Sequence, residues 1–431
     1  MSLLLARLVE RIEDRSAKVA IVGLGYVGLP LALRAVEVGF EVIGIETSEE
    51  RRGAIEEGRA YIEDVDETAL RSALDDGRLT VGAEYDEVKN ADVVLICVPT
   101  PLLTGVPDLS FVLSALDTLV PHLSEGTLIS LESTTYPGTT EEVVRPRIEE
   151  SGLRVGEEVF LVFSPERIDP GNERYRVADI PKVVGGVTET CGTAGEAFYS
   201  ALVSKVVRVR SPREAELAKL LENTYRQVNI ALANEFAMVA HELDIDIWEV
   251  IDAAATKPFG FQPFRPGIGI GGHCIAVDPV YLTWRIRELG RSPFRLVELA
   301  REVDDAMPRY VARRIIESLG RDPKGARVLA LGVTYKPDVA DVRESRAPQV
   351  LAQLQREGVE IAYHDPYCAT LSVDGRTIER ADLAEVPRAD LVAILTHHSV
   401  YDWNDVVATS KRVFDARGVT QGMADDKIER L

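Results

Sequence analysis

Residues 266–279 combine a glycine-rich stretch with a lone cysteine and an aspartate. Four glycines precede Cys274, and Asp278 follows it by four residues. Glycines lack a Cβ and tolerate positive φ, so a ligand can approach the backbone of such a loop closely. A thiol near a carboxylate could carry out covalent chemistry on a carbonyl group. The alternative is a buried structural cysteine beside a turn aspartate, and we favour chemistry because the chain also contains a cofactor motif.

That motif is a dinucleotide-binding pattern in residues 18–46. An apolar strand runs into Gly23, Gly25 and Gly28 with the spacing Gly-x-Gly-x-x-Gly, and a helical pattern follows to about residue 38. In this arrangement the first glycine makes a tight turn, the second admits a pyrophosphate and the third lets the helix pack on the strand. The amide groups at the start of the helix are then free to bind phosphates.

The second strand of this pattern ends in Glu46, about twenty residues after the glycines. A carboxylate there can accept hydrogen bonds from ribose hydroxyls and would repel a 2′-phosphate, which favours NAD over NADP. Arg51 follows on the expected adenine side, so the preference against NADP is less strict. The expected cofactor contacts are Gly23, Gly25, Tyr26, Val27, Gly28, Glu46, Arg51, Pro99, Thr100 and Thr134.

Three further strand-like runs end in polar residues. The runs are residues 91–101, which contain Pro99 and Thr100, residues 127–138, which contain Thr134, and residues 159–167, which contain Glu166. Ligands of open parallel sheets bind at the carboxyl ends of the strands. We therefore expect these strand ends to face the nicotinamide and the substrate, although such loops can also serve only to turn the chain.

A long helical pattern starts at Ser211-Pro212, which is a typical helix start. Lys219 and Asn223 are four residues apart on it and therefore share one face. A polar stripe at a subunit contact could explain this pair without a role in chemistry. A helix of this length is in either case a candidate core for a homodimer.

A last strand–helix alternation begins near Pro308, with strands predicted at 326–333, 359–366 and 389–396. Lys336 and Arg343 lie between its first strand and helix, where they could grip phosphates. The glycine fingerprint is absent, so another nucleotide is expected here and not a second NAD.

The predicted fold is α/β, with two doubly wound, Rossmann-like parallel-sheet domains joined by a long central helix. The predicted domains are 1–210 (NAD), 211–307 (helical dimerisation with the cysteine loop) and 308–431 (another nucleotide).

Composition limits the classes of partner. The 431 residues include 46% hydrophobic residues and carry a net charge of −21, which argues against nucleic acid or anionic lipid as the main partner. No apolar run reaches the eighteen residues of a membrane span. The four cysteines are scattered without a Cys-x-x-Cys pair, as is typical of a cytoplasmic protein without disulfides or a zinc site.

Taken in order, these motifs resemble the UDP-glucose/GDP-mannose dehydrogenase family over nearly the whole chain. The resemblance rests on residues 23–28, 132–134, 164–167, 219 with 223, 271–274 with 278, and 336 with 343. It implies a four-electron oxidation of a sugar C6 hydroxyl to a carboxylate, with two NAD per substrate. Cys274 would add to the aldehyde, giving first a thiohemiacetal and then a thioester.

The resemblance also implies residue roles. Lys219 and Asn223 would stabilise an oxyanion at the C6 oxygen, and Asp278 with a water or Lys219 would take the alcohol proton. Thr134 would position that water, and Glu166 would assist thioester hydrolysis as a general base. The expected substrate contacts are Glu166, Arg167, Lys219, Asn223, Phe264, Gly271, Lys336 and Arg343.

Three stretches, 132–140, 256–264 and 281–284, are most similar to the UDP-N-acetylglucosamine 6-dehydrogenase branch. Ala276 is instead typical of the UDP-N-acetylmannosamine branch. The sequence therefore favours UDP-N-acetylglucosamine, with UDP-N-acetylmannosamine and then UDP-glucose as alternatives. A one-step β-hydroxyacid dehydrogenase and a non-catalytic sugar-nucleotide binding protein are the competing classes.

Overall fold

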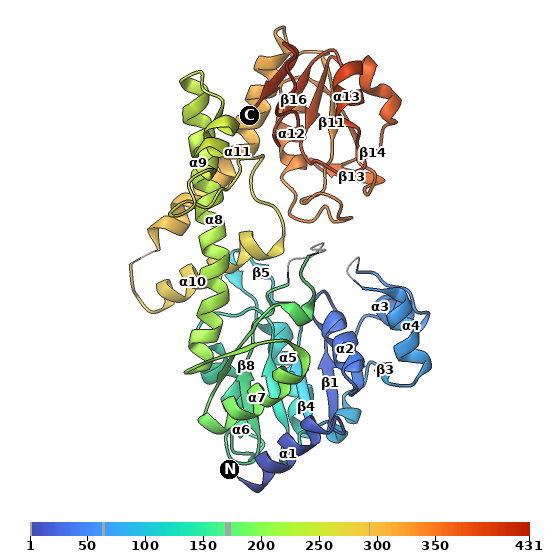
Figure 1. The fold of residues 1–431 in the computed structure, drawn as a ribbon, viewed down its shortest axis with the longest axis vertical. Helices are drawn as coiled ribbons and strands as arrows, with labels where there is room; N and C mark the ends of the chain where they lie inside the picture. Colours follow the sequence, from blue (N-terminus) through green and yellow to red (C-terminus); the bar gives the residue numbers. More distant parts are fainter. Residues whose placement is uncertain (1, 63–64, 169–173, 293) are drawn as a thin grey trace. The chain divides into compact units, whose positions relative to one another are not determined.

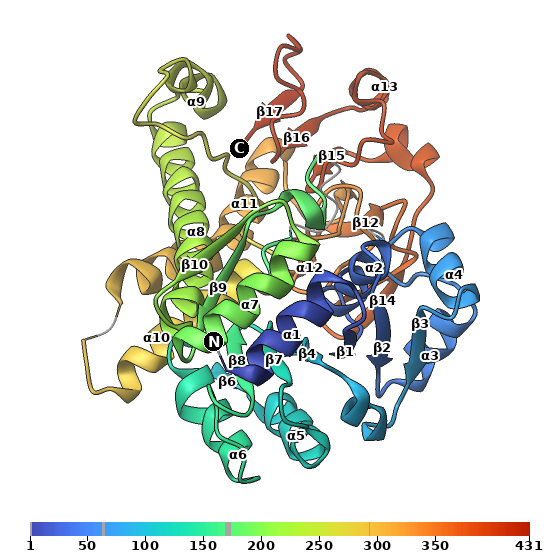
Figure 2. The ribbon, with the colours of Figure 1, turned by 60° about the horizontal axis from the view of Figure 1, so that its bottom comes forward.

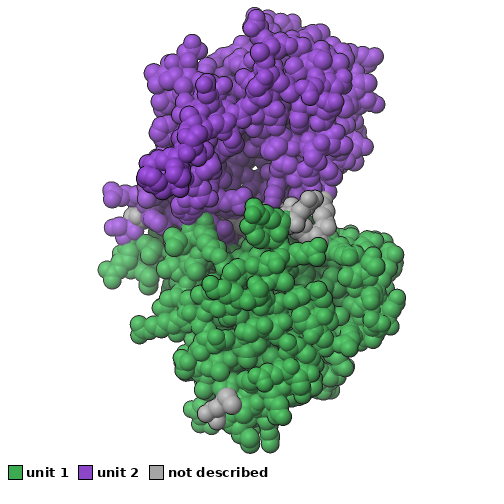
Figure 3. Space-filling model, viewed as in Figure 1, with its two compact units in different colours: residues 1–222, 280–291 green, residues 223–279, 292–431 purple. Residues whose placement is uncertain are grey.

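The computed structural model describes residues 2–62, 65–168, 174–292 and 294–431, with the backbone alone for His273, Cys274 and Ala276. The chain divides into two compact units (Figure 3), residues 1–222 with 280–291 and residues 223–279 with 292–431. Two helices, α8 (Pro212–Glu242) and α10 (His273–Glu288), contribute residues to both units.

The first unit is built on one large sheet (Figure 1), which comprises eight strands within the described residues. In spatial order they are β10 (Val206–Val209), β9 (Lys182–Gly186), β8 (Phe160–Phe163), β7 (Leu128–Leu131), β4 (Val93–Ile96), β1 (Lys18–Val22), β2 (Glu41–Ile45) and β3 (Leu79–Gly82). Strands β4, β7 and β8 are buried at every residue. Continuous apolar runs of this kind are expected where helices cover both faces of a parallel sheet.

The order of the strands determines where a ligand can bind. Strand β1 pairs in parallel with β2 on one side and with β4 on the other. The winding of the chain therefore reverses between β1 and β4, which creates a switch point at the carboxyl ends of these strands. One edge departs from the parallel pattern, because β9 runs antiparallel to β8. The first residue of β9 consequently lies at the same edge of the sheet as the last residues of β8.

The first unit has one α-helix before its first strand and six others between its strands, within the described residues. They are α1 (Leu3–Glu13), α2 (Gly28–Glu37), α3 (Glu49–Glu56), α4 (Glu67–Asp75), α5 (Ser110–Leu119), α6 (Arg145–Glu149) and α7 (Glu189–Leu202). Figures 1 and 2 show α1 beside α7, far apart in sequence, and Leu5, Leu8 and Ile12 of α1 are buried.

The second unit contains a smaller sheet in which all neighbouring strands are parallel. Its order is β12 (Glu360–His364), β11 (Arg327–Leu331), β15 (Leu391–Ile394), β16 (Val413–Asp415) and β17 (Ile428–Arg430). Its helices are α9 (Ile247–Ala255), α11 (Arg295–Leu319), α12 (Ala347–Arg356) and α13 (Trp403–Thr409), together with residues of α8 and α10. This order resembles the flavodoxin-like 2-1-3-4-5 arrangement, whose switch point lies between β11 and β15.

The predicted architecture of two doubly wound sheets and a long helix is confirmed. Strand β9 makes the edge of the first sheet mixed instead of purely parallel. Pro308, the predicted start of a third domain, lies inside α11. Among the described residues, no helix has both the length and the apolar character needed to cross a bilayer.

Candidate active site

The glycines after β1 have the geometry that a bound pyrophosphate requires. Gly23 has φ +89°, and a Cβ there would lie 2.9 Å from the carbonyl oxygen of Cys97. A Cβ on Gly28, the first residue of α2, would lie 1.9 Å from the carbonyl oxygen of Gly23. At Gly25, by contrast, no described heavy atom lies within 4 Å of the Cβ position. Two glycines therefore close the turn tightly, while the third leaves an open face for phosphate at the start of a helix.

Glu46 holds the same loop in position. The residue is 5% exposed, and its carboxylate accepts hydrogen bonds from Leu24 N at 3.2 Å and Ser48 N at 3.0 Å. Each carboxylate oxygen has a further lone pair for a ribose hydroxyl. Arg51 Nη1 lies 3.8 Å from Glu46 Oε2, and its guanidinium stacks over Tyr61. These residues fit NAD, with Arg51 beside the carboxylate that would repel a 2′-phosphate.

The remaining predicted cofactor residues lie on the loops around this turn. Tyr26 is exposed, Val27 precedes the first residue of α2, and Pro99 is exposed after β4. The carbonyl oxygen of Thr100 accepts a hydrogen bond from Tyr281 Oη at 2.7 Å.

Thr134 and Lys219 are brought together in the first unit. Lys219 Nζ, on α8, donates a hydrogen bond to Thr134 Oγ1 at 2.5 Å, although the two residues are 85 positions apart. Both side chains are half-buried. An ammonium group presented beside a hydroxyl at the end of β7 can stabilise developing negative charge on an oxygen.

Glu216, one helical turn before Lys219, anchors the same loop and was not identified from the sequence. Its carboxylate accepts hydrogen bonds from Gly138 N at 2.6 Å, Thr140 N at 2.9 Å and Thr140 Oγ1 at 2.7 Å. Burial raises the pKa of Glu216 to about 7, against the lowering effect of these donors. The loop that carries Thr134 is therefore bound to α8 at two places.

Glu166 is bonded through both of its carboxylate oxygens. Oε1 accepts from the backbone N of Arg167 at 2.6 Å and of Ile168 at 2.9 Å, and Oε2 accepts from Lys182 Nζ at 2.8 Å. The predicted substrate residue Arg167 directs its guanidinium to Glu222, with N–O distances of 2.6 and 3.0 Å, and to a backbone carbonyl. In the described conformation its charge is thus matched by a carboxylate within the first unit.

Asn223 and Asp278 form a pair in the second unit. Asn223 Nδ2 donates to Asp278 Oδ2 at 2.6 Å, and Asp278 is 3% exposed. Asp278 lies on α10 four residues after Cys274, and α10 begins at His273. The backbone of Cys274 therefore belongs to the first turn of a helix, whereas its side chain lies outside the described part of the structure.

The glycine-rich segment before Cys274 is held by buried polar side chains. Asn234 Oδ1 accepts from Gly267 N at 2.8 Å, and Asp304 Oδ1 accepts from Ile270 N. Arg346 donates to the carbonyl oxygen of Ile270 at 3.0 Å and pairs with Asp304 at 2.7 Å. Both polar groups of residue 270 are thus fixed by one ion pair, which the sequence did not reveal.

The same segment packs against the loop that carries Lys336 and Arg343. A Cβ on Gly271 would lie 2.9 Å from the carbonyl oxygen of Glu344, and one on Gly272 would lie 2.9 Å from Tyr335 Cε2. Two segments proposed to contact substrate are therefore adjacent within the second unit. Arg343 is already in a two-point ion pair with Asp341, at 2.7 and 2.9 Å.

A further predicted contact, Phe264, is half-buried at the start of this segment. Its ring packs edge-on against Tyr225 of α8, with 5.7 Å between the centroids.

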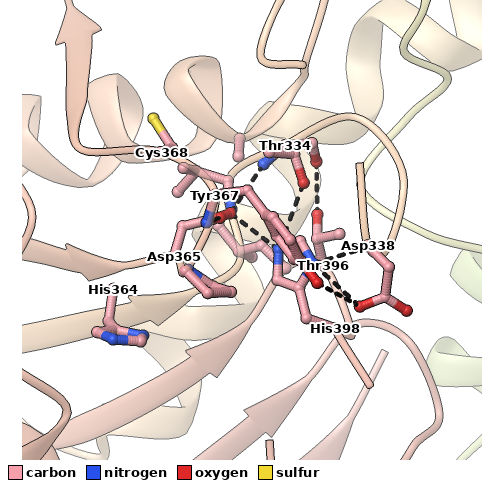
Figure 4. A network of polar contacts seen from close by, with 12 residues as sticks. Thr334, Asp338, His364, Asp365, Tyr367, Cys368, Thr396 and His398 are labelled. Atoms are coloured by element: carbon pink, nitrogen blue, oxygen red, sulfur yellow. Dashed lines mark hydrogen bonds and ion pairs between the residues drawn. The ribbon is translucent and has the colours of Figure 1, made fainter. Parts of the chain in front are cut away.

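A buried polar network fixes the loop with Lys336 at the switch point of the second sheet (Figure 4). Asp365, after β12, accepts from Val333 N at 2.6 Å, Thr334 N at 3.2 Å and His398 Nε2 at 2.9 Å. His398 Nδ1 accepts from the backbone N–H of Asp338 at 2.9 Å. The imidazole is therefore neutral with its proton on Nε2. Burial alone would raise the pKa of Asp365, but His398 and the backbone donors lower it.

Comparison with known proteins shows that parts of both units match the same protein family. Three models of one family match the chain: the NAD-binding domain at residues 17–203, the central domain at 213–306 and the UDP-binding domain at 329–422. The UDP-N-acetyl-D-mannosamine dehydrogenase of Methanocaldococcus jannaschii is 35% identical over 389 residues, which cover 89% of this chain and 86% of that protein. The chain belongs to the UDP-glucose/GDP-mannose dehydrogenase family.

Two other members of the UDP-glucose/GDP-mannose dehydrogenase family give similar matches. The UDP-N-acetyl-D-glucosamine 6-dehydrogenase of Pseudomonas aeruginosa is 36% identical over 361 residues, covering 82% of this chain and 83% of that protein. The structure of the Pyrococcus horikoshii UDP-N-acetylmannosamine dehydrogenase has a TM-score of 0.86 at 31% identity, covering 96% of this chain and 98% of that one. This chain is thus an NAD-dependent nucleotide-sugar dehydrogenase with a UDP-sugar as its substrate class.

Proposed function

We propose that the chain oxidises the C6 hydroxyl of a UDP-N-acetylhexosamine to the uronic acid in two steps, through a covalent intermediate on Cys274. The observation that carries this proposal is the packing of residues 271–272, just before Cys274, against the loop with Lys336. A cysteine that closely follows a segment packed on a proposed phosphate-binding loop is suited to a sugar linked to a diphosphate, because the diphosphate fixes the position of the sugar.

In the first step, the side chains around the C6 oxygen remove a proton and stabilise the resulting charge. Asp278, with a water positioned by Thr134 or with Lys219, accepts the hydroxyl proton. Lys219 and Asn223 stabilise the oxyanion character of that oxygen. NAD supplies, when bound, the hydride acceptor for each of the two oxidations.

In the second step, the thiolate of Cys274 adds to the aldehyde carbon and gives a thiohemiacetal. Loss of hydride from this carbon leaves a thioester, and water activated by Glu166 releases the carboxylate and regenerates the thiolate. The backbone of Cys274 lies in the first turn of α10, four residues before Asp278, which supports Cys274 as the nucleophile.

The proposed contacts with the UDP moiety lie mainly in the second unit. Lys336 and Arg343 would bind the diphosphate, with Gly271 and Phe264 beside the sugar. Arg343 would have to share its charge between Asp341 and a phosphate. Arg167 would similarly have to leave Glu222 to contact substrate.

Two epimers are candidates for the sugar. Residues 132–140, 256–264 and 281–284 favour UDP-N-acetylglucosamine. UDP-N-acetylmannosamine is the second candidate, because Ala276 is typical of that branch and because the M. jannaschii and P. horikoshii relatives carry that name. Steady-state rates with the two sugars and with UDP-glucose test the choice. A kcat/KM for UDP-glucose above that for both acetylated sugars would contradict the proposal.

The covalent step is tested with the variant Cys274→Ser. This variant is expected to stall after the first oxidation or to retain its product tightly, because a hydroxyl is a poor nucleophile without a strong base. Cys368→Ser is the matched control, since Cys368 is buried in the second unit and its Sγ donates to the carbonyl oxygen of Thr370. Full turnover by Cys274→Ser would contradict the covalent step.

We also propose a homodimer. Large apolar residues on α8, directly after α8 and on α11 are exposed in the second unit, and exposed apolar side chains of this kind are typical of subunit contacts. They are Leu232, Phe236, Val239, Leu243, Leu296 and Leu299. One chain has a mass of 47.4 kDa, and light scattering should give twice this value. The variant Phe236→Glu should yield monomers. A monomeric wild-type protein would contradict this assembly.

Two further proposals concern organisation and location. The chain is proposed to comprise three functional domains, residues 1–210, 211–307 and 308–431. It is proposed to work in the cytoplasm, which fits the three described cysteines, Cys97, Cys191 and Cys368, all unbonded and buried.

A further inference from the structure

Lys182 lies between two carboxylates in the interior of the first unit. Its Nζ donates to Glu132 Oε2 at 2.6 Å, to Glu166 Oε2 at 2.8 Å and to the carbonyl oxygen of Pro165 at 3.2 Å. These three acceptors match the three N–H donors of an ammonium group. The exposed fractions of Lys182, Glu132 and Glu166 are 4%, 1% and 7%, so solvent screens these charges little.

The antiparallel edge of the sheet produces this arrangement. Phe163 of β8 pairs with Gly185 of β9, and the same register carried three residues further sets Glu166 opposite Lys182. Glu132 comes directly after the neighbouring strand β7. If β9 were parallel to β8, Lys182 would lie at the opposite edge of the sheet.

A buried hydroxyl chain completes the environment of Glu132. Tyr199 Oη donates to Glu132 Oε1 and lies 2.7 Å from Ser130 Oγ. Burial raises the pKa of Glu132, and the single ammonium group shared with Glu166 does not offset this effect. At Glu166, burial alone would raise the pKa, but Lys182 and the two backbone N–H donors lower it. The two carboxylates thus compete unequally for one ammonium group.

We infer that Lys182 and Glu132 are positioning residues that set the charge and orientation of Glu166 for the thioester step. Lys182 keeps Glu166 ionised and points its Oε2 along the sheet edge, and Glu132 limits this effect by sharing the ammonium group. The inference rests on the proposed role of Glu166, which would otherwise be protonated by burial and unable to accept a proton from water.

Two variants are expected to move the titration of Glu166 in opposite directions. Glu132→Gln leaves the ammonium group to Glu166 alone, so the pKa of Glu166 should fall below its wild-type value. The double variant Lys182→Met/Glu132→Gln removes one positive and one negative charge and so keeps the net charge of the cluster. Glu166 then loses its counter-ion, and its pKa should rise by about 1–3 units. Lys182→Met alone leaves two buried carboxylates without a counter-ion and is expected to reduce stability.

The titration is measured by isotope-edited infrared difference spectroscopy, with the carboxyl band of Glu166 assigned by its loss in Glu166→Gln. The pH profile of kcat is measured on the same proteins. Lys205→Met, which removes an exposed lysine of the first unit, is the matched control and should leave both profiles unchanged.

Opposite shifts of the Glu166 band in the two variants would support the inference, with the acidic limb of kcat following them. An unchanged band in both variants would overturn it. If the Glu166 band shifts while the pH profile of kcat stays constant, Lys182 and Glu132 do control the ionisation of Glu166. That result would instead contradict the proposed role of Glu166 in hydrolysis.

Discussion

Glu216 offers a quantitative test of how α8 holds the loop with Thr134. Burial raises the pKa of this carboxyl from its ordinary value of 4.5 to about 7. A shift of roughly 2.5 units corresponds to about 3.4 kcal/mol between the two protonation states. Between these pH values the folded chain holds a proton that the unfolded chain has released. Stability therefore falls as the pH rises through this window.

The perturbation is Glu216→Gln, which does not titrate. The variant should be less stable than the wild type near pH 4.5, because the amide presents N–H groups toward the N–H of Gly138 or Thr140. Above pH 7 the wild type has lost its protonated form, so the difference between the two proteins should shrink by about 3 kcal/mol.

Amide hydrogen exchange of residues 136–142 measures this difference locally, which avoids assuming two-state unfolding of a chain with two compact units. The exchange free energies of wild type and Glu216→Gln are compared at pH 5 and pH 8, after correction for intrinsic rates. Glu235→Gln, at an exposed site on the same helix, is the control and should not alter exchange in this loop. An equal difference at both pH values would refute the argument.

Two other results are expected from the glycine turn and from the network of Figure 4. Gly25→Ala should leave stability unchanged and weaken NAD binding about tenfold or more, whereas Gly28→Ala should cost about 1–3 kcal/mol of stability because its Cβ meets a carbonyl oxygen. Thermal melts and NAD titration distinguish the two; equal effects of both variants on stability would contradict the geometry. Asp365→Asn should weaken UDP binding about tenfold without altering NAD binding, because it disturbs the loop with Lys336. Calorimetry with UDP measures this effect. An unchanged affinity for UDP would show that the network does not position the loop with Lys336 for UDP binding.

The sequence predicted the parts of the fold that local patterns control. The fingerprint of residues 23–28 and the apolar runs that became β1, β4, β7 and β8 depend on spacing within a few residues. The switch points follow from strand order, which the alternation of strands and helices suggested. The antiparallel direction of β9 could not be predicted, because a short apolar run does not indicate in which direction its strand will pair.

The side chains that hold the site together could not be predicted in this way. Lys182 contacts Glu132 from 50 positions away, and Glu216 contacts Gly138 from 78 positions away. In the sequence, each is an ordinary charged residue of the kind that usually faces solvent. Arg167 shows the reverse effect, since its motif suggested a substrate contact while the fold supplies Glu222 as its partner.

The central claim is that one active site removes two hydrides from one sugar because a thiol captures the aldehyde. The direct measurement is the number of NADH molecules formed for each UDP-N-acetylhexosamine consumed, with product identified by mass spectrometry. The account predicts two NADH and a uronic acid, with no free aldehyde. One NADH per sugar, with the aldehyde as product, would contradict it.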